Sequence, residues 1–356
     1  MTAGPWGSEQ GAGGGGRRLA LAVVGDSDSH SYQDRNHFAP GNGERGGAWR
    51  AVTLCWGEVL ARLRGDAIDL GEWGLRGNHW RVARMLERLG RPARSPYKED
   101  HRYNFAMTGN RCVELLGGRH RQVPRLLALM AREPERWRDG VVVIRIGVND
   151  IGSPVALEDF ARNGAEAAMH AHVRSCVDDI RRAVAAIRLA QPTLRIVLVG
   201  IFDNSNCARH LARWSDPAML ARIRQGLDGF DAPLRAMANA DPRIAFFDDR
   251  AWFAARWGTR AADGQPGFRP LVLADGLAVG NTVGDDPRHA VLCDGHAGLA
   301  MNAEWARSLV DLLNTRFDCG LRPITRGETA ALVRAAASTA VAGAVEDAAT
   351  GVPVPG

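Results

Sequence analysis

Long apolar runs and lysine are what this chain of 356 residues largely lacks. No run reaches the roughly 18 apolar residues of a membrane-spanning helix, so we expect none. Lys98 is the only lysine, and the net charge of +5 therefore rests on arginine. The arginines are spread among acidic residues along the chain and form no dense basic block. These absences argue against a helical membrane protein and against nucleic acid as a partner.

Cysteine is also sparse, and no pair has the spacing of a zinc site or a CxxC motif. The six cysteines lie far apart, at positions 55, 112, 176, 207, 293 and 319. Reduced thiols in a cytoplasmic protein are therefore the expectation. The N-terminus points to the same location, because the apolar run Leu19–Val24 is too short for a signal peptide and leads directly to Ser27.

Between its ends the chain alternates short apolar runs with segments of helical periodicity. Four runs indicate buried parallel strands: Leu19–Val24, Val141–Ile146, Arg195–Gly200 and Arg243–Phe247. Helical spacing marks residues 123–132, 173–189, 219–238 and 303–313. Pro233 is expected to kink or divide the third of these helices. The alternation predicts an α/β fold, a three-layer doubly wound sandwich with a central, mostly parallel sheet.

Composition divides the chain into one domain and two tails. Residues 1–18 form a glycine-rich, flexible tail, and residues 326–356 form an alanine-rich tail in which a short helix is plausible. The domain between them, residues 19–325, carries irregular insertions at about 35–104 and 258–292. Ligands of open α/β sheets bind at the carboxyl ends of the strands, so we expect such loops to shape a cleft.

Polar residues follow the first two strands at the ends where a parallel sheet gathers its functional side chains. The sequence Gly-Asp-Ser at 25–27 allows a sharp bend that presents the hydroxyl of Ser27, although Asp and Ser are also common helix caps. The sequence Gly-Val-Asn-Asp at 147–150 places an amide donor at Asn149, with Asp150 able to hold the loop. Turns favour the same residue types, so each motif alone is weak.

Two further segments complete the set. Gly109 ends the segment 104–109 and can offer a bare backbone N–H. The sequence Cys-Asp-Gly-His at 293–296 directly precedes the last expected helix. Histidine is the natural general base near neutral pH, and an acidic neighbour such as Asp294 can orient His296.

In this order and context, the four segments resemble the blocks of the SGNH hydrolase family, also called GDSL esterases. The resemblance spans about residues 19–315 and is clearest at 25–27 and 147–150. It implies a flavodoxin-like α/β sandwich with Ser27 as nucleophile, His296 as base and Asp294 as its partner. It also implies an oxyanion hole made by the N–H groups of Ser27 and Gly109 and the amide of Asn149. Asp26 and Asp150 would support these residues, and no metal or other cofactor is needed.

The last segment departs from the family's pattern, which places the aspartate three residues before the histidine. Asp294 stands two residues before His296, and Cys293 occupies the usual position. A backbone carbonyl, Asp285 or Asp286 are alternatives for orienting His296. The sequence from Asp286 to His289 does have the family's spacing. We favour His296 as base because it immediately precedes the final helix.

These residues predict serine-dependent hydrolysis of a carboxylic ester through an acyl-enzyme on Ser27. The substrate would be a small molecule or a carbohydrate ester, for example an acetylated sugar. Two alternatives stay open: an O-acyltransferase that uses the same acyl-enzyme and excludes water, and a non-catalytic ligand-binding protein on the same scaffold. The presence of Ser27, Asn149 and His296 argues against the binding protein. No G-x-G-x-x-G turn follows the first strand, which argues against a nucleotide-binding protein.

Overall fold

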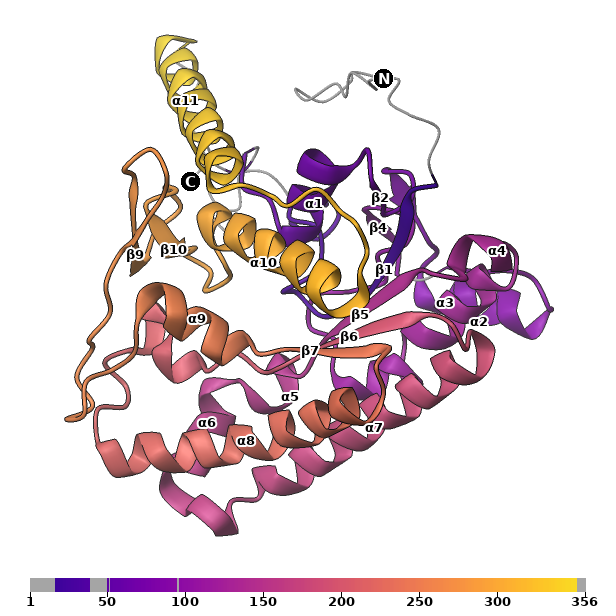
Figure 1. The fold of residues 1–356 in the computed structure, drawn as a ribbon, viewed down its shortest axis with the longest axis horizontal. Helices are drawn as coiled ribbons and strands as arrows, with labels where there is room; N and C mark the ends of the chain where they lie inside the picture. The colour runs from indigo at the N-terminus through magenta and orange to yellow at the C-terminus, as the bar shows by residue number, and fades with distance from the viewer. Residues whose placement is uncertain (1–16, 39–49, 51, 95, 351–356) are drawn as a thin grey trace.

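A five-stranded parallel sheet forms the centre of the computed structural model, which describes residues 17–38, 50, 52–94 and 96–350 (Figure 1). The strand order is β2-β1-β5-β6-β7, and each neighbouring pair is parallel. The strands are β1 (Leu19–Gly25), β2 (Ile68–Asp69), β5 (Val141–Arg145), β6 (Arg195–Val199) and β7 (Ile244–Phe247). The predicted α/β fold with a central parallel sheet is confirmed.

Helices cover both faces of this sheet, because its strands are buried on both sides. Along β1, Leu21 and Val23 belong to one buried apolar cluster, while Ala22 and Val24 belong to the other. The first face is covered by α1 (Trp56–Arg64), α9 (Asp249–Trp257) and α10 (Leu299–Phe317), and α11 (Arg326–Thr350) packs its first half on the same apolar cluster. The opposite face is covered by α3 (Gln122–Met130), α6 (Pro154–Asn163), α7 (Met169–Ala190) and α8 (Pro217–Ala240).

Part of the first expected insertion, residues 35–104, belongs to the buried core of the sandwich. It holds the edge strand β2 and helix α1, whose Trp56, Val59 and Leu60 are fully buried. A smaller unit follows along the chain, made of β3 (Leu75–Arg76), α2 (Trp80–Arg88) and β4 (Lys98–Glu99). Apolar residues of α1 therefore assign part of this segment to the sandwich itself.

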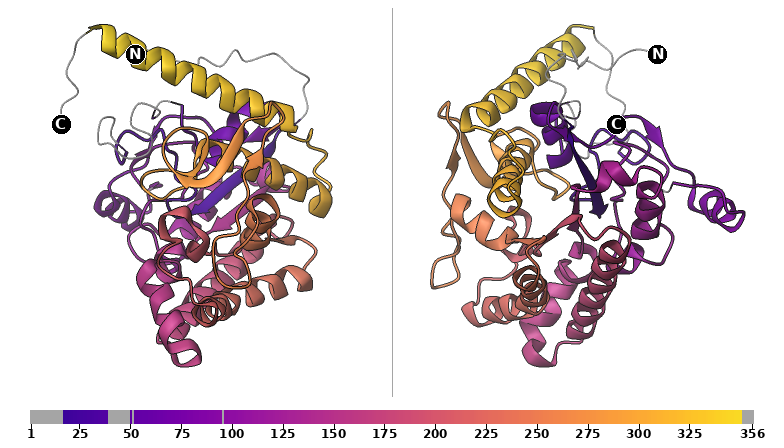
Figure 2. Two further views of the ribbon diagram at one scale, coloured as in Figure 1. Left: turned by 90° about the vertical axis from the view of Figure 1, so that its left-hand side faces the viewer. Right: turned by 45° about the vertical axis from the view of Figure 1, so that its right-hand side comes forward.

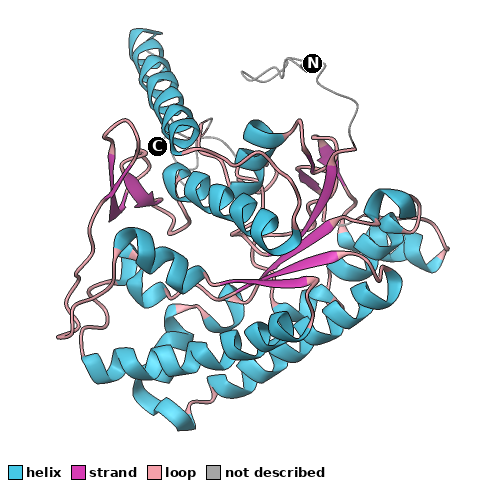
Figure 3. Cartoon of the chain, in the orientation of Figure 1, coloured by secondary structure: helices cyan, strands magenta, loops and turns pink. Residues whose placement is uncertain are grey.

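The second expected insertion, residues 258–292, forms a small three-stranded sheet of its own. Its order is β10-β9-β8, with β8 (Leu271–Val272), β9 (Ala278–Val283) and β10 (His289–Val291). Figure 3 shows this sheet apart from the central one. Short helices complete the described elements: η2 (Cys112–Leu115), α4 (Pro134–Trp137), α5 (Val148–Ile151), η3 (Gly164–Glu166), η4 (Asn204–Asn206) and η5 (Ala208–His210).

Two helices differ from the expectation. Helix α8 runs unbroken through Pro233, so the predicted division is wrong. Proline removes one hydrogen bond from a helix, but the buried side chains of Phe230 and Leu234 hold α8 in the same apolar cluster on both sides of it. The segment from residue 326 begins with α11, in which Leu332 and Val333 are buried, and Figure 2 shows α11 in yellow extending beyond the rest of the domain.

Two tail segments, residues 1–16 and 351–356, lie outside the described residues. Within the part that is described, no helix is both long and apolar enough to cross a membrane.

Candidate active site

Ser27 lies in a tight turn directly after β1, at the carboxyl edge of the central sheet. The N–H groups of Ser29 and His30 donate to the carbonyl of Asp26 at 3.2 and 3.1 Å, and the N–H of Asp28 donates to the Asp26 carboxylate at 3.1 Å. Ser27 is 5% exposed, and within the described part of the chain its N–H has no hydrogen-bond partner. The turn therefore leaves one backbone donor unused beside the hydroxyl.

Burial raises the pKa of the Asp26 carboxyl well above its usual range, and the neighbouring Asp28 adds to this. Asp26 is 1% exposed, and its side chain accepts a hydrogen bond within the turn. Its role in the structure is thus to shape the turn that carries Ser27.

Gly25 is held from two sides, and no other residue fits its position. A Cβ on Gly25 would lie 2.1 Å from the carbonyl oxygen of Arg145 on β5, a distance that real side chains do not tolerate. The side chain of Gln122, at the start of α3, accepts from the N–H of Gly25 and donates to its carbonyl, both at 2.7 Å. The glycine of the motif is therefore required by close strand packing, and Gln122 fixes the backbone just before Ser27.

Arg145 is the one polar residue of the second predicted strand, and it braces both ends of the turn. Its carbonyl accepts from the N–H of Asp26 at 3.3 Å, and its guanidinium donates to the carbonyl of Asp28 at 3.3 Å. The same guanidinium donates to buried Asp249 at 3.1 Å. Trp305 completes the cluster: its ring lies 4.7 Å from the Arg145 guanidinium, and its N–H donates to Asp249 at 2.8 Å. The sequence alone indicates no partner for Arg145.

Gly109 reaches the site because the segment before it runs beside β1. The N–H of Phe105 donates to the carbonyl of Val23 at 2.7 Å, and that of Met107 donates to the carbonyl of Gly25 at 3.2 Å. Gly109 has a φ of +75° and space around the position of a Cβ, and its own N–H has no hydrogen-bond partner among the described residues. A second unused backbone donor is thus carried to the carboxyl edge of β1.

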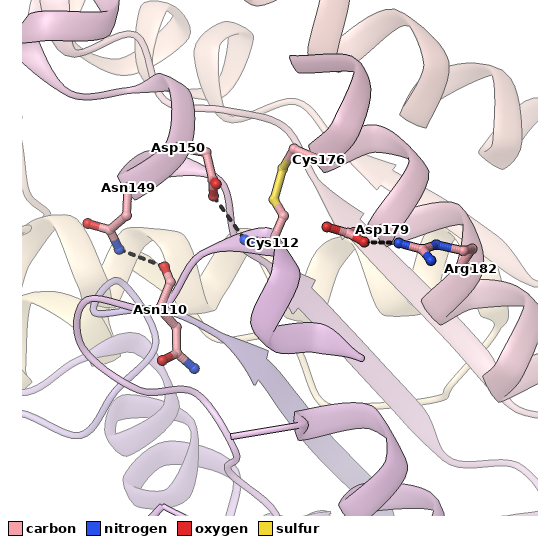
Figure 4. The surroundings of a disulfide bond; sticks show 7 residues. All are labelled: Asn110, Cys112, Asn149, Asp150, Cys176, Asp179 and Arg182. Atoms are coloured by element: carbon pink, nitrogen blue, oxygen red, sulfur yellow. Dashed lines mark hydrogen bonds and ion pairs between the residues drawn. A yellow bond between two sulfur atoms is a disulfide. The ribbon is translucent and has the colours of Figure 1, made fainter. Parts of the chain in front are cut away.

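Asn149 joins the second predicted strand to the Gly109 segment. Its side-chain amide donates to the carbonyl of Asn110 at 2.8 Å, which Figure 4 shows. Asp150 accepts from the N–H of Cys112 at 2.9 Å, as the same view shows. Gly147, at a φ of +124°, makes the turn that starts α5. The structure therefore places the loop of Gly109 beside the short helix α5, and Asn149 and Asp150 of α5 both bond to the residues that follow Gly109.

A disulfide between Cys112 and Cys176 ties this loop to α7 (Figure 4). The two Cα atoms are 5.1 Å apart, although the residues are 64 positions apart in sequence. The expectation of reduced cysteines is wrong for this pair, because the packing of η2 on α7 brings together two residues that no local spacing connects. The bond also removes the support that the cysteines gave to a cytoplasmic location.

His296 lies in the turn between β10 and α10. The nearest carboxylate oxygen of Asp294 is 3.0 Å from the Nδ1 atom of His296 and accepts the backbone N–H of His296 at 2.9 Å. The orientation leaves Nδ1 without a hydrogen-bond partner among the described residues. Gly295, at a φ of +93°, makes this tight turn possible. Asp294 thus lies within reach of the imidazole despite the shortened spacing, but its carboxylate is engaged with the backbone.

The alternative residues have other partners. Nδ1 of His289 lies 2.7 Å from the hydroxyl of Thr282 in the small sheet. Asp285 accepts from the N–H of Cys293 at 3.0 Å, and Asp286 pairs with Arg288 at 2.9 Å. None of these contacts reaches His296.

Tyr32, which follows the turn of Ser27, lies beside His296. Its ring centroid is 6.4 Å from that of His296, and its O–H donates to the carbonyl of Ala297 at 3.2 Å. Ser27 and His296 themselves share no hydrogen bond in the described part of the chain. Such contacts are often long without substrate and tighten in the reacting complex.

A comparison with protein-family models identifies the family of the chain. The model of the GDSL-like lipase/acylhydrolase family matches residues 23–271, more than half of the chain. The chain belongs to this family. As a GDSL-like acylhydrolase it is an enzyme that hydrolyses esters. No curated protein matches it in sequence.

Solved structures of other esterases and lipases are similar to this acylhydrolase at low identity. An acetyl-xylooligosaccharide esterase, Axe2, from Geobacillus stearothermophilus is 13% identical with a TM-score of 0.41, covering 86% of this chain and 97% of its own. An extracellular lipase from Streptomyces rimosus is 16% identical with a TM-score of 0.35, covering 69% and 91%. A GDSL-like lipase from Parabacteroides merdae is 14% identical with a TM-score of 0.37, covering 90% and 96%.

His30, close to the nucleophile, is a structural residue of this acylhydrolase. It is fully buried, pairs with Asp34 at 2.9 Å through Nε2, and accepts the N–H of Thr108 at 3.3 Å through Nδ1. Burial lowers its pKa to about 3. His37 also contacts Asp34, at 2.7 Å. A metal would need the lone pair of Nε2, but the hydrogen bond at Nδ1 places the proton of His30 on Nε2, so this trio does not fit a metal.

Proposed function

We propose that this enzyme hydrolyses a carboxylic ester through an acyl-enzyme on Ser27. Ser27 Oγ attacks the ester carbonyl while His296 takes its proton, and His296 then returns the proton to the leaving alcohol. Water repeats the sequence and releases the acid. Asp294 positions the turn of His296.

This proposal rests on two unused N–H groups and one side-chain amide, carried by segments at the carboxyl edge of the central sheet. The N–H groups of Ser27 and Gly109 have no partner within the described residues, and each belongs to a segment bonded to β1. Asn149 uses its amide on the carbonyl of Asn110, and an amide has a second N–H to offer. Preorganised donors of this kind stabilise the oxyanion that forms in ester hydrolysis.

We further propose a small-molecule or carbohydrate ester as substrate. The chemistry at Ser27 requires only an accessible ester carbonyl, and the acyl and alcohol parts would be selected by the loops around the carboxyl edge of the sheet.

Hydrolysis of p-nitrophenyl acetate by matched serine variants tests the nucleophile. Ser27→Ala should lose at least about 10³-fold in activity. Ser29→Ala is the control, because the Ser29 hydroxyl only accepts a hydrogen bond from the Trp56 ring, at 3.2 Å. Ser29→Ala should still be labelled by a fluorophosphonate, and Ser27→Ala should not. Labelling of Ser27→Ala would overturn the assignment.

A matched pair of histidine variants tests the base. His296→Ala should be as inactive as Ser27→Ala, while His289→Ala should keep most of the wild-type activity. The reverse result would make His289 the base. A wild-type enzyme that neither turns over esters nor reacts with fluorophosphonate would favour the ligand-binding alternative. A wild-type enzyme that is labelled but releases product only when an alcohol acceptor is added would be an acyltransferase.

A further inference from the structure

A cavity of about 380 Å³ lies on the face of the sheet that is covered by α9 and α10. Its walls come from the end of α9, the strand β8, the second turn of α10 and the start of α11. Apolar side chains such as Leu271 and Leu273 form part of the wall. None of the residues proposed for ester hydrolysis lines it, so a ligand here would occupy a separate site.

Four arginines line this cavity, with a single carboxylate among them. The arginines are Arg256, Arg269, Arg307 and Arg326, and the carboxylate is Glu304. Glu304 is 2% exposed and already accepts hydrogen bonds from Arg307 at 2.8 Å and from Thr329 at 3.1 Å. It cannot neutralise the other three arginines as well.

The other three arginines have little negative charge near them. The terminal nitrogens of Arg256 donate to the carbonyl of Trp252 at 3.2 Å and to the hydroxyl of Ser308 at 2.6 Å. Its Nε atom is buried without a hydrogen-bond partner among the described residues, and the nearest carboxylate, Glu304, lies 3.7 Å away. Among the described residues, the side chain of Arg269 donates only to the carbonyl of Ala255, at 3.5 Å. The side chain of Arg326 makes no hydrogen bond or ion pair in the described part of the chain. The next acid, Asp311, lies 3.6 Å from Arg307. With Asp311 and Glu304 both counted, the four arginines still leave two uncompensated positive charges.

This group of arginines is unfavourable without a ligand, because like charges around a partly dry cavity repel each other. A buried donor without a partner also costs free energy. By contrast, Arg250, on the same helix α9, bonds the carboxylates of both Asp228 and Asp231. A guanidinium presents two parallel donors that match two oxygens of one oxyanion. An oxyanion in the cavity would satisfy the free donors and offset the repulsion.

We propose that this cavity binds a small molecule through an oxyanion group, a phosphate, sulfate or carboxylate. The exposed arginines Arg269 and Arg326 form its entrance, and the partly buried Arg256 and Arg307 form its inner side. The apolar wall at Leu271 and Leu273 would contact the uncharged part of the ligand.

Calorimetric titration of the full chain with inorganic phosphate, at an ionic strength fixed by sodium chloride, tests this site. We expect saturable binding of one phosphate per chain and a rise in the midpoint of thermal unfolding. Arg269→Gln and Arg326→Gln should each weaken binding by about tenfold, since each removes a charged donor. Both side chains are exposed, so the variants should fold.

Arg138→Gln is the matched control, because Arg138 is exposed and pairs with Glu135 on α4, away from the cavity. It should bind phosphate as the wild type does. Ser27→Ala should also bind normally, which separates this proposal from the fate of the esterase reaction. Parallel titrations with sulfate and citrate distinguish the phosphate, sulfate and carboxylate classes. Absence of saturable binding for all three anions, or equal binding by Arg269→Gln, Arg326→Gln and wild type, would overturn the proposal.

Discussion

Ser27 and His296 are held in place by contacts of different range. The turn of Ser27 is bonded by Gln122 and by Arg145, at sequence separations of 97 and 117 residues. The turn of His296 is held mainly by its own neighbours: Asp294, and the N–H of Leu292, which donates to the carbonyl of His296 at 2.8 Å. Ser27 is 5% exposed, whereas the side chain of His296 is 25% exposed. The proposed nucleophile is therefore part of the core, and the proposed base is carried by a local turn at its margin.

Arg145→Met should have the largest effect of the changes that test this difference, and it should act on the free energy of unfolding. The change leaves Asp249 buried without its counter-charge, which typically costs about 3–5 kcal/mol in the free energy of unfolding. Urea denaturation measures it. The control is Arg64→Met, because Arg64 is equally buried but its partner Glu328 is 27% exposed and remains solvated. The double variant Arg145→Met/Asp249→Asn should recover much of the loss. An Arg145→Met enzyme as stable as the Arg64→Met control would show that the nucleophile turn does not depend on this cluster.

Asn149→Ala should have the next largest effect, and on rate rather than stability. Loss of one oxyanion donor lowers kcat by about 10²–10³-fold with little change in KM. Steady-state kinetics on p-nitrophenyl acetate measures both. Asn204→Ala is the control, because the Asn204 amide likewise donates to a backbone carbonyl, that of Gly152 at 2.8 Å. Similar losses in both variants would mean that Asn149 acts only through loop structure.

Low pH should lower the free energy of unfolding through His30, which is buried close to Ser27 in the chain. Its pKa in the folded chain, about 3, lies below its ordinary value, so the unfolded chain binds the extra proton first. The stability that neutral His30 contributes is therefore present above about pH 6.5 and is lost as the pH falls toward about 3. Between about pH 6 and about pH 4.5, the free energy of unfolding of the wild type should fall by about 2 kcal/mol more than that of the His30→Gln variant. Equal slopes for the two proteins in urea titrations would contradict this.

The smallest effect should come from Asp294→Asn on the base side. An asparagine oxygen can still accept the N–H of His296, and the Nδ1 atom is not hydrogen-bonded to Asp294 at present. We expect a loss in kcat of less than about tenfold, far below the roughly 10⁴-fold that follows when a catalytic aspartate fixes the histidine tautomer. Asp294→Ala, which removes the turn bond as well, should be more damaging. A loss of about 10³-fold or more in Asp294→Asn would show that its charge supports the imidazolium.

The strands and the order of the motifs could be predicted because they are local. Four of the five central strands lie in short runs made mostly of apolar residues, and the polar motifs at 25–27 and 147–150 follow directly from two of them. The family model matches over most of the span in which these motifs were recognised. Helix ends were less exact: the last helix, expected at 303–313, extends over Leu299–Phe317.

The supports of the site could not be predicted, because they depend on packing between distant segments. Nothing near Arg145 in the sequence indicates that Asp249 will neutralise it 104 residues later. In the sequence, nothing distinguishes Gln122 from other helix residues, because its contact with Gly25 arises only when α3 packs beside β1. The pairing of Cys112 with Cys176 likewise follows only from the contact of η2 with α7.

That disulfide closes a covalent ring in the polypeptide. The ring runs from Cys112 through β5 and the segment of Asn149 to Cys176 on α7, and Gly109 lies just outside its entry. A protease cut at any one bond inside the ring would leave two fragments that stay linked until the disulfide is reduced. The strand that supplies Arg145 and the loop that supplies Asn149 are thus secured to the rest of the molecule by a bond that survives a break in the chain.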